Sequence, residues 1–183
     1  MKTDRVLLKL SGEALAGPKK TGFDEDTVRE VARQVKISVD QGVQVGIVIG
    51  GGNFWRGRTS NAIDRTKADQ IGMLATVMNC IYVSEIFRTE GMKTQIFTPF
   101  LCGSMTELFS KDRANTCFEE GRVVFFAGGR DIPISPRTRA SCCGPLRWMR
   151  TAFCLPSPST AFTTAILSSI RTRSATIPFL SRK

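Results

Sequence analysis

Short apolar runs alternate along this chain with longer segments in which apolar residues recur at helical spacing. The short runs are rich in Val, Ile, Leu and Phe and have the length of buried strands. They cover residues 5–10, 43–50, 93–98 and 122–129. The longer segments predict helices and cover residues 23–42, 64–91 and 106–121. Between the first strand and the first helix, SGEALAGPKKTG reads as a loop or a strand-to-helix turn.

This alternation predicts an α/β protein: a three-layer α/β/α sandwich with a mainly parallel sheet and helices on both faces. Ligands of such sheets bind beyond the carboxyl ends of the strands. Three strands end there in suitable loops, which cover residues 9–12, 50–53 and 128–129. We therefore expect the functional site at this edge of the sheet.

The glycines in these loops predict a site for a polyphosphate. Glycine permits positive φ and lets a ligand approach the backbone closely, so that successive N–H groups can form a nest for anionic oxygens. Lys9 ends the first strand and Arg56 follows Gly50–Gly52, and both offer donors for phosphate. A run of three glycines alone is equally typical of a tight turn, and Lys9 alone of a solvated lysine. Neither a P-loop motif nor a dinucleotide-binding G-x-G-x-x-G occurs.

Three stretches resemble a known family. LLKLSGEAL, VGIVIGGGNFWRG and ADQIGMLATVMN are similar to the bacterial uridylate (UMP) kinases of the amino-acid kinase superfamily. The first stretch is shared across the superfamily, whereas the other two favour UMP kinase over carbamate, glutamate or aspartate kinases. The resemblance covers residues 5–129 and breaks off at Arg130, so the C-terminal half of that fold is missing or scrambled here.

The resemblance implies transfer of the ATP γ-phosphoryl group to UMP, with Mg²⁺ accompanying ATP. It places four residues at the ATP phosphates: Lys9, Leu10, Ser11 and Gly12. Lys9 would stabilise the charge on the transferring group, while Gly52 and Arg56 would help to bind ATP. No general base is needed, because positioning and charge neutralisation do most of the catalysis of phosphoryl transfer.

For UMP, the resemblance implies binding by the Gly51 N–H and by Asp69 within ADQIGMLA. From the residues alone, Asp69 is a carboxylate on a helix surface. The family further implies a homo-oligomer, a hexamer, in the cytoplasm. A small-molecule kinase of another branch of the superfamily is the alternative; a preference for carbamate or an acidic amino acid over UMP would identify it.

Charge and composition argue against other classes of protein, such as nucleic-acid-binding, metal-binding and membrane proteins. The formal net charge is +10, but residues 130–183 hold nine Lys/Arg against one acid, and residues 1–129 hold 17 against 15. The basicity belongs to the tail, which has no recognisable nucleic-acid module, so nucleic-acid binding is the weakest alternative. Six cysteines without C-x-x-C spacing, in a chain without histidine, predict no zinc or redox site. No apolar run approaches the ~20 residues of a membrane span, and no signal peptide is evident.

The chain changes character at Arg130. Residues 130–183 are rich in Arg, Ser, Thr, Pro and Cys and have no sustained pattern, apart from an apolar patch at 161–167. By resemblance, the family continues after the fourth strand with a Gly-Thr-Gly-His-Pro loop that holds UMP, and later with an Asp-Gly-Val-Tyr-Asp-Ser-Asp-Pro-Lys segment on the ATP side. When the codons are read one base out of phase, those of residues 130–133 permit Thr-Gly-His-Pro, and those of residues 159–168 permit the second pattern. We therefore interpret residues 1–129 as the N-terminal part of a kinase domain and residues 130–183 as a frameshifted, poorly ordered tail. A genuine divergent or disordered tail is the competing interpretation.

Overall fold

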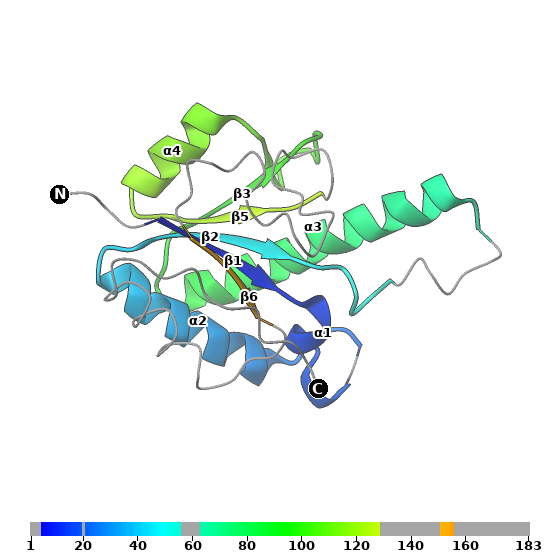
Figure 1. Ribbon diagram of the computed structural model, residues 1–183, viewed down its shortest axis with the longest axis horizontal. Coiled ribbons are helices and arrows are strands. Elements are labelled where there is room, and N and C mark those ends of the chain that lie inside the picture. Colours follow the sequence, from blue (N-terminus) through cyan, green and yellow to red (C-terminus); the bar gives the residue numbers. More distant parts are fainter. Residues whose placement is uncertain (1–4, 20, 56–62, 129–150, 156–183) are drawn as a thin grey trace.

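The computed structural model describes residues 5–19, 21–55, 63–128 and 151–155 of the 183-residue chain (Figure 1). The strands are β1 (Arg5–Leu10), β2 (Gln44–Ile49), β3 (Thr94–Thr98), β4 (Glu107–Leu108), β5 (Val123–Phe126) and β6 (Thr151–Leu155). The helices are α1 (Gly12–Leu15), the 3₁₀ turn η1 (Gly17–Lys19), α2 (Glu25–Asp40), α3 (Arg65–Thr89) and α4 (Lys111–Glu119). The four predicted strands and three predicted helices are confirmed.

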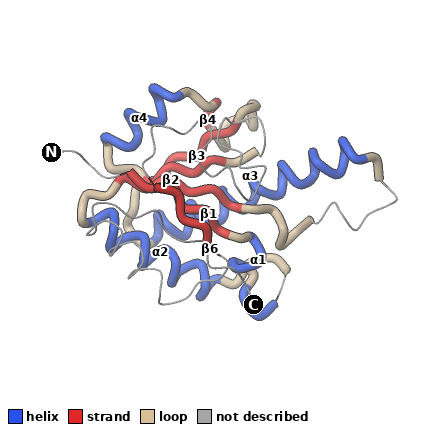
Figure 2. Tube along the Cα trace, in the orientation of Figure 1, coloured by secondary structure: helices blue, strands red, loops and turns tan. Residues whose placement is uncertain are grey.

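These strands form one sheet (Figure 2). Its order is β4-β3-β5-β2-β1-β6, and every neighbouring pair is parallel. Helices α2 and α3 cover one face of the sheet and α4 covers the other (Figure 1). The predicted fold class, a three-layer α/β/α sandwich with a parallel sheet, is therefore confirmed. Parallel pairing throughout places all the strand carboxyl ends at one edge.

Two differences from the predicted elements arise at the edges of the sheet. The helix predicted from residue 106 begins at Lys111, because Glu107 and Leu108 instead pair with Phe97 and Thr98 as β4. In the segment where no element was predicted, β6 pairs with β1, with Val6 opposite Thr151 and Leu10 opposite Leu155. Both strands depend on distant pairing, which local periodicity does not reveal.

Alternation along the strands divides the core into two parts. On the α2 and α3 side, Leu8 of β1 and Ile47 of β2 pack against Val35 and Phe87 of the helices. On the α4 side, Leu7 of β1 belongs with a smaller cluster that includes Phe97, Phe118, Val124 and Phe126. Because both faces of the central strands are buried, their sequences read as continuous apolar runs rather than as alternating ones.

Helix α2 begins at a polar N-cap and ends before a glycine. Its N-cap, Asp24, accepts hydrogen bonds at Oδ2 from the backbone N–H of Thr27 at 3.1 Å and from its hydroxyl at 2.5 Å. Glu25 and Asp26 occupy the first turn, where negative charge favours the helix. At the other end Gly42 has φ 83°, a left-handed conformation that glycine adopts without strain.

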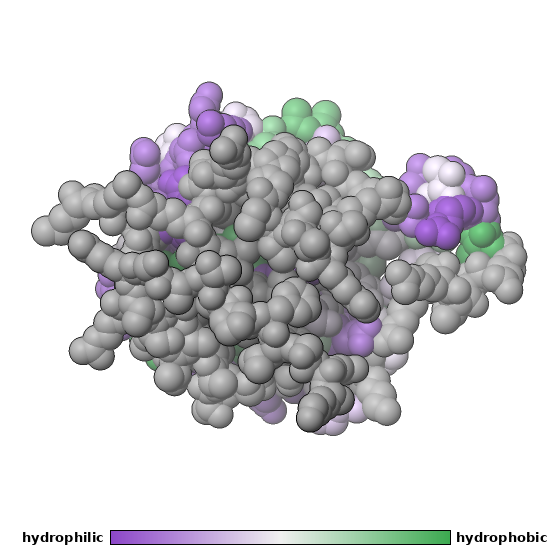
Figure 3. Space-filling view, in the orientation of Figure 1, coloured by the Kyte–Doolittle hydropathy of each residue, from purple (hydrophilic) through white to green (hydrophobic). Residues whose placement is uncertain are grey.

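Helix α3 is the longest element, with 25 residues, and its amino-terminal turns project beyond the sheet (Figure 1). Within the described ranges it is the one helix that could cross a membrane by length and composition. Its buried residues Cys80, Val83 and Phe87 pack on the sheet, which accounts for much of this apolar character. The described surface is hydrophilic over α4 and over the first turns of α3, and a hydrophobic patch lies near α4 (Figure 3).

Candidate active site

The loops after β1 and β2 meet at the carboxyl edge of the sheet, as predicted. Leu10 and Ile49 are paired at the ends of the two strands, and the Gly50 N–H donates to the Leu10 carbonyl at 3.0 Å. The two loops therefore begin side by side. One continues with Ser11 and Gly12, and the other with Gly51 and Gly52. This places Leu10, Ser11, Gly12, Gly51 and Gly52 in one region of the molecule.

Close packing explains why these loops contain glycine. A methyl group at Gly12 would overlap the Gly50 carbonyl oxygen and lie 2.5 Å from Asn53 Oδ1. At Gly51 it would lie 3.0 Å from the Gly72 carbonyl oxygen of α3. The sequence argument from positive φ was wrong for these residues, because none of Gly12 and Gly50–Gly52 has positive φ. At Gly12 and Gly51, contact with the protein's own backbone and side chains, rather than turn conformation, excludes a side chain, whereas a methyl group at Gly50 would meet only ordinary contact distances.

Gly52 packs against the first turn of α1. A methyl group at Gly52 would lie 3.0 Å from Glu13 Oε1 and 3.4 Å from Glu13 Cγ. Ser11 precedes this helix and accepts a hydrogen bond at its carbonyl from the Ala14 N–H at 3.1 Å, but its hydroxyl does not cap the helix. The two glycine turns thus contact each other at Gly12 and Gly50, and again at Glu13 and Gly52.

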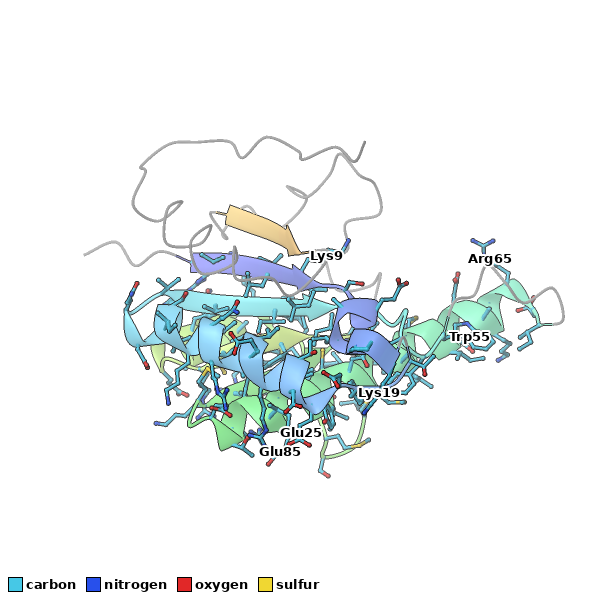
Figure 4. All side chains as sticks on the ribbon, turned by 90° about the horizontal axis from the view of Figure 1, so that it is seen from below. Lys9, Lys19, Glu25, Trp55, Arg65 and Glu85 are labelled. Atoms are coloured by element: carbon cyan, nitrogen blue, oxygen red, sulfur yellow. The ribbon has the colours of Figure 1, made fainter. Side chains whose placement is uncertain are left out.

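Lys9 lies next to these turns with an exposed side chain. It alternates with Leu8 and Leu10, so it stands on the face of β1 opposite the α2 core, and Figure 4 shows it pointing away from α1 and α2. Leu10 is buried and can offer a ligand only its backbone. An exposed ammonium beside two glycine turns can reach an anionic ligand that lies over the turns.

One stripe of α3 faces the same edge. Gly72, Thr76 and Asn79 follow Asp69 at helical spacing, so all four lie on one face of the helix. Gly72 contacts Gly51, the Thr76 hydroxyl accepts from the Gly128 N–H at 2.9 Å, and Asn79 Nδ2 donates to the Gly50 carbonyl at 2.7 Å. Asp69 lies one turn before Gly72 with its side chain exposed. This face of α3 therefore contacts both the loop after β2 and the loop after β5. Asp69 lies on the same face but further from the sheet.

The loop after β5 turns sharply at Gly128, which has φ 95°. A methyl group there would lie 2.6 Å from Pro99 Cδ and 2.9 Å from Phe100 Cε1, so both conformation and packing require glycine. Gly129, which completes the predicted third loop, and Arg56, the predicted ATP ligand, lie outside the described residues.

Sequence reasoning missed a buried pair of asparagines behind the glycine turns. Asn53 and Asn79 are 2% and 0% exposed and bond reciprocally through their amides. Asn53 ends the motif GGGN and Asn79 ends LATVMN. A single asparagine forms no periodic pattern, so neither motif indicates that its asparagine is buried or which residue it bonds. Within the described ranges, no group of three or more His, Cys, Asp or Glu side chains could hold a metal ion.

The fold is that of a parallel α/β protein in which two glycine turns meet at the carboxyl edge of the sheet. The amino acid kinase family matches residues 4–140, and the chain belongs to this family. The match extends ten residues past Arg130, the position at which the resemblance was expected to break off.

Within the family, three proteins similar to this chain are UMP kinases, as the motifs indicated. Uridylate kinase of Bacteroides thetaiotaomicron is 45% identical over 134 residues, which are 72% of this chain and 57% of that protein. UMP kinase of Bacillus anthracis superposes with a TM-score of 0.66 at 33% identity, over 71% of this chain and 55% of that one. UMP kinase of Ureaplasma parvum gives 0.65 at 27% identity, over 70% and 57%. The chain thus spans little more than half the length of these relatives.

Proposed function

We propose that residues 1–129 are the N-terminal part of a UMP kinase, which transfers the γ-phosphoryl group of MgATP to UMP and yields ADP and UDP. The observation that carries this proposal is the direct contact between the glycine turns after β1 and β2, with Lys9 exposed beside them. Similarity to three UMP kinases from different bacteria supports the choice of acceptor.

In this proposal, ATP and UMP bind to different parts of the two glycine turns. ATP lies over Lys9–Gly12, with the Gly52 N–H and Arg56 as further donors. UMP lies on the side of Gly51, with Asp69 binding its nucleoside. Gly51 and Gly52 are consecutive, so donor and acceptor phosphates meet at one peptide unit. Lys9 and the Mg²⁺ of MgATP neutralise the charge that spreads over the transferring group, and no side chain has to remove a proton.

We further propose that residues 130–183 are translated out of frame. The concentration of positive charge, the absence of histidine and the family-like reading in the shifted frame support this proposal. The acceptor-phosphate loop that the family resemblance implies after Gly129 is absent from the printed sequence. We therefore expect little or no UMP turnover from the chain as printed.

We propose a homo-oligomer in the cytoplasm as the working form, by family resemblance. Ile71, Leu74 and Met78 form an exposed apolar line along α3, which is the kind of surface that a second copy can cover. Sedimentation velocity tests this proposal: an oligomer that Leu74→Glu dissociates supports it, and a monomeric parent chain contradicts it.

The decisive experiment compares two versions of the gene, one as printed and one with a single base added at the Gly129 codon. UDP formation is measured for each, next to its own Lys9→Ala variant. We expect UDP only from the version with the added base, and its loss with Lys9→Ala. Turnover of UMP by the printed chain well above its Lys9→Ala control contradicts the frameshift. A preference for carbamate, glutamate or aspartate over UMP contradicts the acceptor and favours another branch of the superfamily.

The nucleic-acid alternative has a separate test. If the basic tail binds DNA or RNA, binding weakens steeply with salt and disappears when residues 130–183 are deleted. We expect neither binding nor a salt dependence, because the shifted reading frame accounts for the arginines of the tail.

A further inference from the structure

The buried amide pair Asn53–Asn79 uses its full donor capacity. Asn53 Nδ2 donates to Asn79 Oδ1 at 3.0 Å and to the Gly22 carbonyl at 2.9 Å. Asn79 Nδ2 donates to Asn53 Oδ1 at 2.8 Å and to the Gly50 carbonyl at 2.7 Å. All four amide N–H groups therefore have partners, and the pair is fixed in one orientation.

The pair connects four segments that are distant in sequence. Asn79 belongs to α3 and Asn53 to the loop after β2. The Gly22 segment bonds Asn53 twice, because the Gly22 N–H also donates to the Asn53 carbonyl at 3.3 Å. The turn after β1 packs on both amides: a methyl group at Gly12 would lie 2.5 Å from Asn53 Oδ1 and 3.1 Å from Asn79 Nδ2. The two glycine turns are thus held against one rigid polar unit.

The bond from Asn79 to Gly50 has a directional consequence. The Gly50 carbonyl and the Gly51 N–H belong to one trans peptide unit, so they point in opposite directions. When Asn79 holds this carbonyl, it aims the Gly51 N–H away from the amide pair. Among the described residues, no acceptor bonds the N–H of Gly51 or of Gly52. Within the described ranges these two donors face no acceptor, and the direction of the first depends on Asn79.

We propose that Asn79 is a positioning residue for the acceptor nucleotide: through the Gly50 carbonyl it orients the Gly51 N–H toward UMP. This proposal rests on the proposed function, which gives the Gly51 N–H to UMP. An apolar pair could fill the same space, but it would leave the peptide unit free to rotate. The amide pair thus gives the turn an orientation as well as packing.

The test compares Asn79→Ser, which retains one small donor, with Val83→Ala. Val83 is fully buried one turn further along α3, so its truncation destabilises the same helix without touching the glycine turns. A second variant, Asn79→Leu, keeps the size and removes every donor. For each full-length protein the thermal midpoint, the Kd for UMP and the amide NMR signal of Gly51 are measured at a temperature well below the midpoint.

We expect Asn79→Ser to raise the Kd for UMP at least tenfold and to shift the Gly51 amide signal. Val83→Ala should leave the Kd within twofold and the Gly51 signal in place, even with a lower thermal midpoint. Asn79→Ser that binds UMP like the parent while folded overturns the proposal. If the parent chain itself does not bind UMP, the assignment of the Gly51 N–H to UMP in the printed chain fails separately. In that case the Gly51 amide signal alone tests the positioning role of Asn79. A signal in the Asn79 variants that is unchanged from the parent overturns this role.

Discussion

Gly12→Ala tests the contact between the two glycine turns most sharply. The added methyl group overlaps the Gly50 carbonyl oxygen and Asn53 Oδ1 and lies 3.1 Å from Asn79 Nδ2, and none of these atoms is the mobile end of a long side chain. Overpacking of this kind destabilises by about 1–3 kcal/mol. Displacing the Gly50 carbonyl also breaks its bond to Asn79, and a buried group left unpaired adds about 1–3 kcal/mol. We therefore expect a loss of about 3 kcal/mol in the free energy of unfolding, which for a domain of this size lowers the thermal midpoint by about 6–12 °C.

The control is Gly50→Ala, on the other side of the same contact. A methyl group there would lie 3.7 Å from the Gly12 nitrogen and 3.9 Å from the Leu10 carbonyl, which are ordinary contact distances, and Gly50 has no positive φ. We expect a change within about 0.5 kcal/mol. Urea unfolding followed by circular dichroism, with the slope checked for constancy, measures both variants. Equal stability of the two variants would refute the close approach of the turns.

Three further expectations concern single groups. Thr76→Val removes the acceptor of the Gly128 N–H and should lower the free energy of unfolding by about 1–3 kcal/mol in urea unfolding, whereas Thr116→Val on the exposed surface of α4 should change it little. Hydrogen bonds from Thr27 hold the pKa of Asp24 below its usual range. The ionised N-cap therefore stabilises the folded protein above the unfolded pKa of about 3.9, and this stabilisation is lost as the pH falls through the lower pKa of the folded state. The midpoint deficit of Asp24→Ala in thermal scans should accordingly be largest near neutral pH and shrink in acid; an equal deficit at every pH would contradict the cap. Burial raises the pKa of the Cys80 thiol, so brief iodoacetamide treatment and peptide mapping should find label on the partly exposed Cys102 but not on Cys80, and early labelling of Cys80 would argue against its burial.

Much of the fold follows from local patterns. The apolar runs of β1, β2, β3 and β5 and the helical spacing of α2 are visible in the sequence, because strands buried on both faces and amphipathic helices have distinct periods. The edge strands β4 and β6 could not be predicted in this way. Each is a short run whose partner, Thr98 or Leu10, lies elsewhere in the chain, so pairing rather than propensity determines it.

The position of the candidate site at the sheet edge was predictable from the sequence. The contacts that hold its loops in place were not. Lys9 and the glycine turns lie at the predicted edge, because parallel strands bring their carboxyl ends together. The reason for the glycines could not be read from the sequence, since Gly12 is required by a carbonyl 38 residues away rather than by its own φ. The pair Asn53–Asn79 spans 26 residues, and neither member has a local pattern that indicates its partner.

Resequencing the gene across the codons for Gly128 to Asp131 and onward tests the central claim most directly, that a UMP kinase reading frame is interrupted after a correctly translated first half. We expect one additional base in this region, after which the frame encodes Thr-Gly-His-Pro and, further on, the Asp-Gly-Val-Tyr pattern of the family. A gene that encodes residues 130–183 as printed, without an additional base, would contradict this expectation. If the protein made from that gene also formed UDP above its Lys9→Ala control, residues 130–183 would be a genuine part of the kinase.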